Sequence, residues 1–310
     1  MTEFELIARL TKSLPTNDSV VVGAGDDCAV LECGNPSREL LLKTDAVVEG
    51  IHFTKETTPE KIGRKAMARC LSDIAAMAGT PNAAVVTIAL PKDYSVEFIE
   101  RVYSGINTLA EQHGVAIVGG ETTTSPERVL ISIALTGYVP RGKAVLRSGA
   151  KVGDAIFVTG ELGGSIAAKH LDFEPRLAEA CWLAENFSVH AMMDLSDGLA
   201  GDLPHILRAS DVGAELLKSA VPISRAAREN AKRGDAAKPA FVAALTDGED
   251  FELLFTVASR SAVPLLDAWK MRFPDVKLSC IGKVITGEGI RLRDQTGVRP
   301  LKAHGYVHLS

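Results

Sequence analysis

Short apolar segments of strand length alternate with longer amphipathic segments along almost the whole chain. In the longer segments the apolar residues recur every three or four positions, which is the helical period. Because each helix must bury its apolar stripe against a sheet, this alternation favours α/β or α+β layers. Before residue 141 we expect strands over 39–48, 83–90 and 128–139, a short strand over 115–118 running into a glycine turn at 119–120, and helices over 59–79 and 95–114.

The segment Arg141–Gly149 interrupts the alternation, because it is rich in Gly, Lys and Arg and has no apolar period. With 310 residues the chain also exceeds the usual size of a single hydrophobic core. We therefore expect two domains, 1–141 and 142–310. In the second domain we expect strands over 155–160, 190–195, 251–258 and 276–285, and helices over 165–171, 174–187, 197–210, 239–248 and 262–273.

Composition narrows the class of protein. Apolar residues make up 46% and charged residues 24%, which is typical of a soluble globular protein. The formal net charge is −5 and no basic block occurs, so we expect no nucleic-acid partner. No apolar run approaches the roughly 20 residues of a membrane span, and the N-terminus does not resemble a signal peptide. Five scattered cysteines without a CxxC pair predict reduced thiols in a cytoplasmic protein.

Acidic residues follow apolar segments or flank glycines at several separate places. Taken singly, each carboxylate is weak evidence, because it can be a turn residue, a helix cap or, for Asp73, a solvated residue in mid-helix. Taken together they would repel one another unless cations neutralise them. Mg²⁺ prefers such oxygen ligands and is often bound together with substrate phosphates, so the set predicts a magnesium and polyphosphate site. Its members are Asp26, Asp27, Asp45 with the neighbouring Thr44, Asp73, Glu121, Asp194, Asp197, Asp247, Glu249 and Asp250.

Two further features leave alternatives open. The glycine-rich segment Gly160–Ser165 either cradles an anion or is a plain strand-to-helix turn, and no GxxxxGK[ST] phosphate loop occurs in the chain. Asp202 lies close to Asp194 and Asp197 but falls within the next expected helix. We expect it to be solvated or structural, whereas the other two are expected to hold ions.

Seven motifs in order resemble bacterial thiamine-monophosphate kinase, over nearly the whole chain. They are GAGDDCAVL, KTDAVVEGIHF, KAMARCLSDIAAMAGTP, VGGETTTS, LTGYVPRGKAVLRSGAKVGDAIFVTGELGGS, MMDLSDGLAGDLPHILRAS and TDGEDFELLFTV. The resemblance implies a two-domain, synthetase-like α/β (α+β) fold. It places the dimer contact and the ATP site on an N-terminal mixed-sheet domain, with a C-terminal α/β domain completing the active site. It also implies phosphorylation of thiamine phosphate by ATP with several Mg²⁺ ions, giving thiamine diphosphate, in a homodimer.

The resemblance assigns roles to individual residues. Metal ligands are implied at Asp27, Thr44, Asp45, Asp73, Glu121, Asp194 and Asp197. ATP contacts are implied at Tyr103, Gly119, Gly120, Arg147 and Ser196, and thiamine-phosphate contacts at His52, Glu249 and Tyr306. No catalytic base is assigned, because the acceptor phosphate is already ionised at neutral pH and the reaction is expected to be a direct in-line transfer.

The chain departs from the family pattern at three positions near these residues. Glu121 stands where the family usually has Asp, Lys43 where it has Ser or Thr, and Asp247 where it has Gly. Glu121 also occurs in the synthetase branch of the wider superfamily, so another ATP-dependent synthetase is an alternative. A non-catalytic regulator that binds Mg²⁺ and nucleotide is a second alternative.

Overall fold

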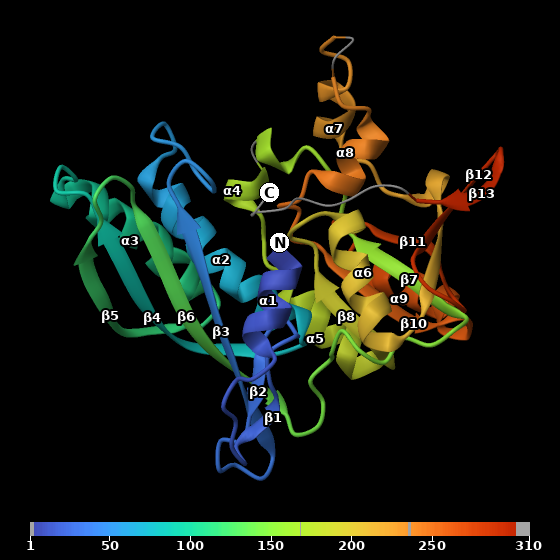
Figure 1. Ribbon diagram of the computed structural model, residues 1–310, viewed down its shortest axis with the longest axis horizontal. Helices are drawn as coiled ribbons and strands as arrows, with labels where there is room; N and C mark the ends of the chain where they lie inside the picture. The colour runs from blue at the N-terminus through green and yellow to red at the C-terminus, as the bar shows by residue number, and fades with distance from the viewer. Residues whose placement is uncertain (1–2, 168, 235–236, 302–310) are drawn as a thin grey trace.

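The computed structural model describes residues 3–167, 169–234 and 237–301, and these residues form two mixed β-sheets with helices packed on them (Figure 1). The first sheet has the strand order β1-β2-β3-β6-β4-β5. Only the β4–β5 pair is parallel among its neighbouring strands. Its strands are β1 (Val20–Val22), β2 (Ala29–Leu31), β3 (Arg38–Val48), β4 (Thr80–Leu90), β5 (Ala116–Thr124) and β6 (Leu130–Pro140).

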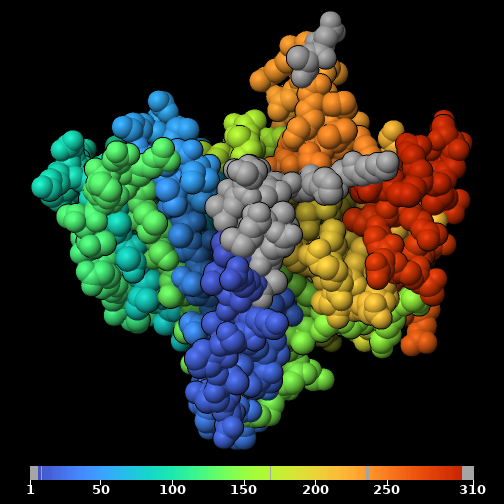
Figure 2. All heavy atoms as spheres, viewed as in Figure 1, coloured from blue at the N-terminus to red at the C-terminus, as the bar shows by residue number. Residues whose placement is uncertain are grey.

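Helices α2 (Pro59–Ala76) and α3 (Val96–Gln112) lie against one face of the first sheet. Because side chains alternate along a strand, Leu41 and Val47 of β3 are buried beneath α2, whereas Leu42 points to the opposite face and is 41% exposed. Val85 of β4 and Val118 of β5 are also exposed, at 40% and 66%. Helix α1 (Glu3–Thr11) precedes the sheet, and the β1–β2 hairpin projects from one end of the molecule (Figures 1 and 2).

The second sheet has the order β13-β12-β9-β11-β7-β10-β8. It is built from β7 (Asp154–Thr159), β8 (Val189–Asp194), β9 (Gly213–Leu217), β10 (Leu253–Ala258), β11 (Leu278–Ile285), β12 (Ile290–Asp294) and β13 (Gly297–Pro300). Its helices are α4 (Lys169–Asp172), α5 (Leu177–Asn186), α6 (Leu199–Ser210), α7 (Arg225–Asn230), α8 (Ala240–Thr246) and α9 (Ala262–Arg272), with short 3₁₀ turns at Ser165–Ala167, Lys218–Ala220 and Ser259–Ser261.

The two faces of the second sheet belong to different hydrophobic cores. Ile156 and Val158 point into a core shared with α6 and α8. Phe157 and Phe255 point the other way, and their rings stack with centroids 5.5 Å apart. This second set of side chains is continuous with the core of the first sheet, so α2 and α5 are packed between the two sheets. The two domains therefore hold each other in place through buried apolar side chains.

The mixed α/β fold with two sheets agrees with the expected fold class. The boundary expected after residue 141 falls in the segment between β6 and β7, which contains no helix or strand. Strands β9, β12 and β13 lie at one edge of the second sheet and were not expected from the apolar pattern. No helix in the described residues is both long and apolar enough to cross a membrane.

The glycine turn expected at Gly119–Gly120 is wrong. Strand β5 continues through both glycines to Thr124, with a register shift opposite the Ala84–Val85 step of β4. A Cβ built on Gly120 would lie 1.9 Å from the carbonyl oxygen of Val86, so glycine here allows the two strands to stay paired. Glu121 is consequently a strand residue and does not follow a turn.

Helices α2 and α3 approach each other closely through a pair of glycines. A Cβ on Gly63 would lie 1.9 Å from the carbonyl oxygen of Val102, and one on Gly105 would lie 1.9 Å from that of Glu60. Backbone atoms cannot move aside as a flexible side chain can. The depth at which α2 sits, and with it the position of the polar residues it carries, therefore depends on these two glycines.

We predict that Gly63→Ala destabilises the protein by about 2 kcal/mol or more, because the added methyl forces α2 and α3 apart. Helix propensity alone predicts the opposite sign, a gain of up to about 1 kcal/mol. Urea unfolding decides between the two. Gly23→Ala is the control, because a Cβ there meets nothing closer than 3.8 Å. A Gly63→Ala protein as stable as wild type would contradict the close contact.

Candidate active site

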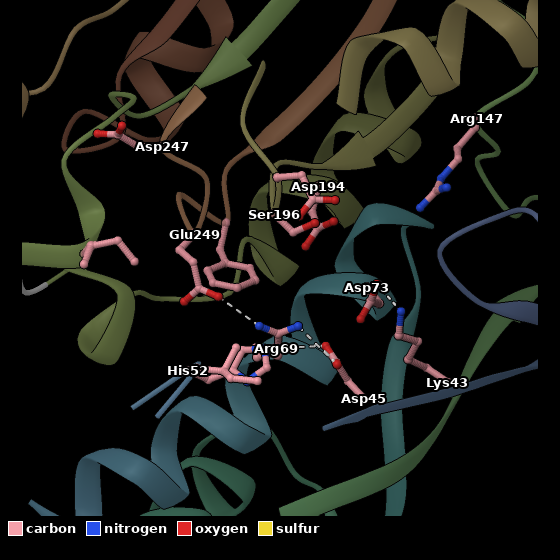
Figure 3. Close-up of a pocket in the computed structure, with 14 residues that line it drawn as sticks. Lys43, Asp45, His52, Arg69, Asp73, Arg147, Asp194, Ser196, Asp247 and Glu249 are labelled. Atoms are coloured by element: carbon pink, nitrogen blue, oxygen red, sulfur yellow. Dashed lines mark hydrogen bonds and ion pairs between the residues drawn. The ribbon is translucent and has the colours of Figure 1, made fainter. Parts of the chain in front are cut away.

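A cavity of about 380 Å³ lies between the two domains and is lined mainly by charged residues (Figure 3). Strand β3 and helix α2 of the first domain form one side. The turn between β8 and α6, together with the loop that precedes β10, forms the other. The lining residues are Lys43, Asp45, Ile51, His52, Arg69, Asp73, Arg147, Ile166, Asp194, Ser196, Asp197, Asp247, Glu249 and Phe251.

Three carboxylates from distant parts of the chain meet at the deep end of the site. Asp27 precedes β2, Asp73 lies near the end of α2, and Asp194 ends β8. One oxygen of each lies within 4.8 Å of the others, and each residue is at most 5% exposed. Burial, together with repulsion by the neighbouring acids, raises the pKa of Asp73 and of Asp194.

The cluster fits a hard divalent cation. Its donors are carboxylate oxygens, the ligands that Mg²⁺ prefers. Asp194 accepts a hydrogen bond from Ser72 Oγ at 2.6 Å, which orients one of its oxygens. Among the described residues, Asp27 Oδ2 has no hydrogen-bond partner although it is buried. A buried anionic oxygen without a partner is costly, and a bound cation would satisfy it.

Each of three acids at the site is paired with a basic side chain, and Figure 3 shows the pairs of Asp73 with Lys43 and of Asp45 with Arg69. Arg147 Nη2 donates to Asp27 Oδ1 at 2.6 Å, and Lys43 Nζ donates to Asp73 Oδ1 at 2.8 Å. Arg69 holds Asp45 with two hydrogen bonds of 2.9 and 3.2 Å.

Glu249 is held by three basic groups and lies at the domain boundary. Arg69 Nη1 donates to its Oε1 at 2.9 Å, and Lys65 Nζ and the His170 ring contact its Oε2. Burial acts to raise the pKa of Glu249, but hydrogen bonding from His170 and the charges of Lys65 and Arg69 lower it to about 2. The carboxylate is therefore ionised throughout the physiological pH range.

The backbone around Glu249 is unusual. Glu249 and Phe251 both have left-handed conformations, with φ of 58° and 49°. Two hydrogen bonds fix this loop to the turn after β8: Glu249 N donates to the Ser196 carbonyl, and Phe251 N donates to the Leu195 carbonyl, each at 2.7 Å. Such strained residues persist only where the surroundings hold them, and they are common at functional sites.

His52 also lines the cavity. Its Nδ1 accepts a hydrogen bond from Val48 N at 3.0 Å, which leaves Nε2 to carry the proton of the neutral ring. Its carbonyl oxygen accepts from Lys65 Nζ at 2.8 Å, so one buried lysine connects His52 to Glu249.

The structure brings most of the predicted site residues together, but not all. Asp45, Asp73, Asp194, Asp197, Arg147, Ser196, His52 and Glu249 line the cavity, and Asp27 contacts Arg147 beside it. The side chains of Thr44 and Glu121 point to the open face of the first sheet, where Thr44 Oγ1 lies 3.4 Å from Ser132 Oγ and Glu121 is paired with Thr87. Gly119 and Gly120 lie on the edge strand β5, and Tyr103 of α3 packs against the hydrophobic core. Tyr306 lies outside the described residues.

The structure bears on two alternatives that the sequence left open, the role of the segment Gly160–Ser165 and that of Asp202. In the segment Gly160–Ser165, the backbone N–H of Gly163 donates to Asp250 and that of Gly164 donates to Asp247. These donors are satisfied by carboxylates, which favours a structural turn. Asp202 is buried and accepts from Asp197 N at 3.0 Å, so the solvated alternative is wrong and the structural one holds.

Sequence reasoning assigned Arg147 but missed two other basic residues of the site, Lys65 and Arg69. Lys65, Arg69 and Asp73 are spaced four residues apart, which places them on one face of α2. That spacing was visible in the sequence, but a charged face of a helix normally points to solvent. Lys65 instead is only 1% exposed.

Comparisons with known proteins bear on this arrangement. Residues 25–139 match the N-terminal domain of AIR synthase related proteins, and residues 151–294 match their C-terminal domain. The thiamine-monophosphate kinase of Rhodopirellula baltica is 39% identical over 96% of this chain and 93% of its own length. That of Escherichia coli K12 is 33% identical over 99% of this chain and 98% of its own.

This chain belongs to the thiamine-monophosphate kinase family. A solved structure described as AaThiL complexed with AMPPCP and TMP covers 99% of this chain and 97% of its own, with 31% identity and a TM-score of 0.82. The hydrogenase maturation protein HypE of Escherichia coli superposes with a TM-score of 0.72 at 20% identity, which shows a shared fold.

We predict that Asp194→Asn raises the melting temperature of the metal-free protein by a few degrees at neutral pH. Because the pKa of Asp194 is raised in the folded state, its charge opposes folding above that pKa. The amide removes the charge and keeps the hydrogen bond from Ser72. The gain should disappear as the pH falls through the raised pKa to the ordinary value of an aspartate, since both forms are then neutral.

Thermal melts in EDTA over a series of pH values measure this effect. Asp172→Asn is the control, because Asp172 is half exposed and pairs with Lys61 at the surface. A lower melting temperature for Asp194→Asn at neutral pH would mean that the cluster is not electrostatically strained.

Proposed function

We propose that this protein transfers the γ-phosphoryl group of ATP to thiamine phosphate and forms thiamine diphosphate and ADP. The observation that carries the proposal is the buried cluster of Asp27, Asp73 and Asp194 at one end of a cavity between the two domains. It is supported by relatives named for this activity and by the similar structure that holds AMPPCP, an ATP analogue, together with TMP. We also propose a cytoplasmic location, since all five cysteines are free.

The chemistry requires little covalent help from the protein. An oxygen of the acceptor phosphate attacks the γ-phosphorus, a new P–O bond forms, and the bond to the ADP oxygen breaks. The attacking oxygen is already ionised, so no residue needs to remove a proton. We assign no covalent intermediate, and the protein acts by positioning two anions in line and neutralising their charge.

Asp27, Asp73 and Asp194 are the residues that would hold Mg²⁺, with Asp45 and Asp197 at the cavity wall. Bound Mg²⁺ supplies positive charge to the phosphates of the nucleotide. Arg147 reaches the same region, and its planar guanidinium suits a phosphate group. Ligand roles for Thr44 and Glu121 stay predictions, as do the ATP contacts of Tyr103, Gly119 and Gly120.

The other end of the cavity suits thiamine phosphate. Phe251, Ile51 and Ile166 contribute apolar surface for a flat heterocycle. Glu249 stays ionised and can attract the positively charged thiazolium, and His52 presents a ring N–H. Arg69 lies between Glu249 and Asp45, so it borders both the substrate end and the metal end.

We predict that purified protein converts thiamine phosphate and Mg-ATP to thiamine diphosphate, and that Asp73→Asn lowers kcat by about a hundredfold or more. The amide keeps the shape of Asp73 but removes the charge that would bind the cation. Chromatography of thiamine diphosphate measures the product, and circular dichroism checks that the variant is folded. ATP binding without any turnover of thiamine phosphate would instead favour a regulator or another synthetase.

We propose further that two copies of the chain pair through the open face of the first sheet. This face exposes Leu42, Val85 and Val118, with the small residues Thr44 and Ala134 paired across its centre. Apolar strand faces of this kind are normally covered. Moreover, β5 is separated from β3 by two strands, so the residues predicted to contact ATP on β5 cannot line the cavity of their own chain. A second copy would bring them to it.

We predict that Glu121→Gln and Asp194→Asn are each inactive alone, and that refolding them together restores about a quarter of wild-type activity. Half of the mixed population would then be heterodimers, and each heterodimer would have one site free of both changes. The product assay after co-refolding measures the recovery, and light scattering gives the oligomeric state. A monomer, or a mixture with no recovered activity, would contradict a site shared between two chains.

A further inference from the structure

Lys43 places a fixed positive charge inside the acidic cluster. The strand alternation of β3 points Lys43 and Asp45 toward α2 and the cavity, whereas Thr44 points away. Lys43 Nζ lies 2.8 Å from Asp73 Oδ1, and the two side chains are only 23% and 8% exposed. The ammonium is therefore held in the cluster by geometry and does not extend into solvent.

Counting charges shows what the lysine changes. Asp27, Asp73 and Asp194 together carry three negative charges when ionised, and Arg147 balances the charge of Asp27. Without Lys43, the charges of Asp73 and Asp194 would be uncompensated. Their total of two negative charges equals in magnitude the charge of one divalent cation. With Lys43 in place, one negative charge is left.

An ammonium and a divalent cation compete for the same carboxylate oxygen. Asp73 Oδ1 already accepts from Lys43 at 2.8 Å, and a positive charge a few ångströms away repels an incoming cation. Ser72 holds Asp194 by a hydrogen bond but brings no charge. Lys43 is thus the cavity-lining residue whose positive side chain forms an ion pair with Asp73.

We propose that Lys43 replaces one divalent cation of the phosphate-binding site, so that this protein binds one fewer such ion than the same site would with a neutral residue at position 43. The ammonium neutralises Asp73 permanently and presents its remaining N–H donors toward the cavity, where a phosphate oxygen of the nucleotide can accept them. Lys43 is in this sense a positioning residue of the metal cluster. The inference rests on the metal site of the proposed function, but it does not depend on turnover.

The test counts Mn²⁺, a paramagnetic substitute for Mg²⁺. The EPR signal of free Mn²⁺ is titrated against the full-length protein, with and without saturating AMPPCP and in the absence of thiamine phosphate. Lys43→Met, which keeps the length of the side chain but not its charge, is expected to bind one more Mn²⁺ per chain than wild type, or to bind Mn²⁺ at least about tenfold more tightly. Lys43→Ser should do the same.

Lys169→Met is the matched control. Lys169 Nζ lies 2.7 Å from the buried carboxylate of Glu252, away from the aspartate cluster, so this variant loses the same charge and a similar ion pair. It should bind Mn²⁺ as wild type does. If the Lys43 variants bind the same number of ions with the same affinity as wild type, or if Lys169→Met gains as much as they do, the proposal is overturned.

A folding defect would not prevent a decision. If the Lys43 variants are unfolded without metal, circular dichroism during Mn²⁺ addition shows whether the divalent ion restores the fold, as expected if it takes the place of the ammonium. Failure of Mn²⁺ to restore them would count against the proposal. Because no step of this test uses the kinase reaction, a protein inactive on thiamine phosphate would still give a clear count.

Discussion

The mutual repulsion of Asp27, Asp73 and Asp194 is the interaction on which the arrangement of the site depends. Three buried carboxylates within 4.8 Å of one another are unfavourable in a folded protein unless positive charge is nearby. Arg147 and Lys43 supply part of that charge from within the chain. The remaining deficit is what makes the cluster suitable for a divalent cation and, through it, for the phosphates of a nucleotide.

Helix α2 connects this electrostatic centre to the rest of the fold. Its buried side chains contribute to the core between the two sheets, and its polar face carries Lys65, Arg69 and Asp73, of which Arg69 and Asp73 line the cavity. Two of these residues reach across to Glu249 in the other domain. The contact between the domains and the geometry of the site therefore both depend on α2, and a shift of this helix would alter both.

Much of the architecture could be predicted from local sequence patterns. The helical period of residues 59–79 and 95–114 agrees with α2 and α3, and the continuous apolar runs agree with β4, β7 and β10. The local sequence pattern gave a wrong prediction where one tertiary contact decides the backbone conformation. Gly119 and Gly120 suggested a turn, but the close approach of Gly120 to Val86 requires the same residue type for β5 to stay paired with β4. Strands β12 and β13 were missed because they lie at a sheet edge, where few of their residues are buried.

The sequence by itself determined the family, because its carboxylates beside strands and glycines occur in an order that resembles one family, and the comparisons agree with it. Only the tertiary structure decided which of them meet. Alternation along β3 separates Asp45 from Thr44 by the thickness of the sheet, and the position of β5 places Glu121 away from Asp73 within one chain. The acids that pair with Lys43, Lys65 and Arg69 could not be assigned in advance, because the partner of a charge depends on contacts between residues far apart in the sequence.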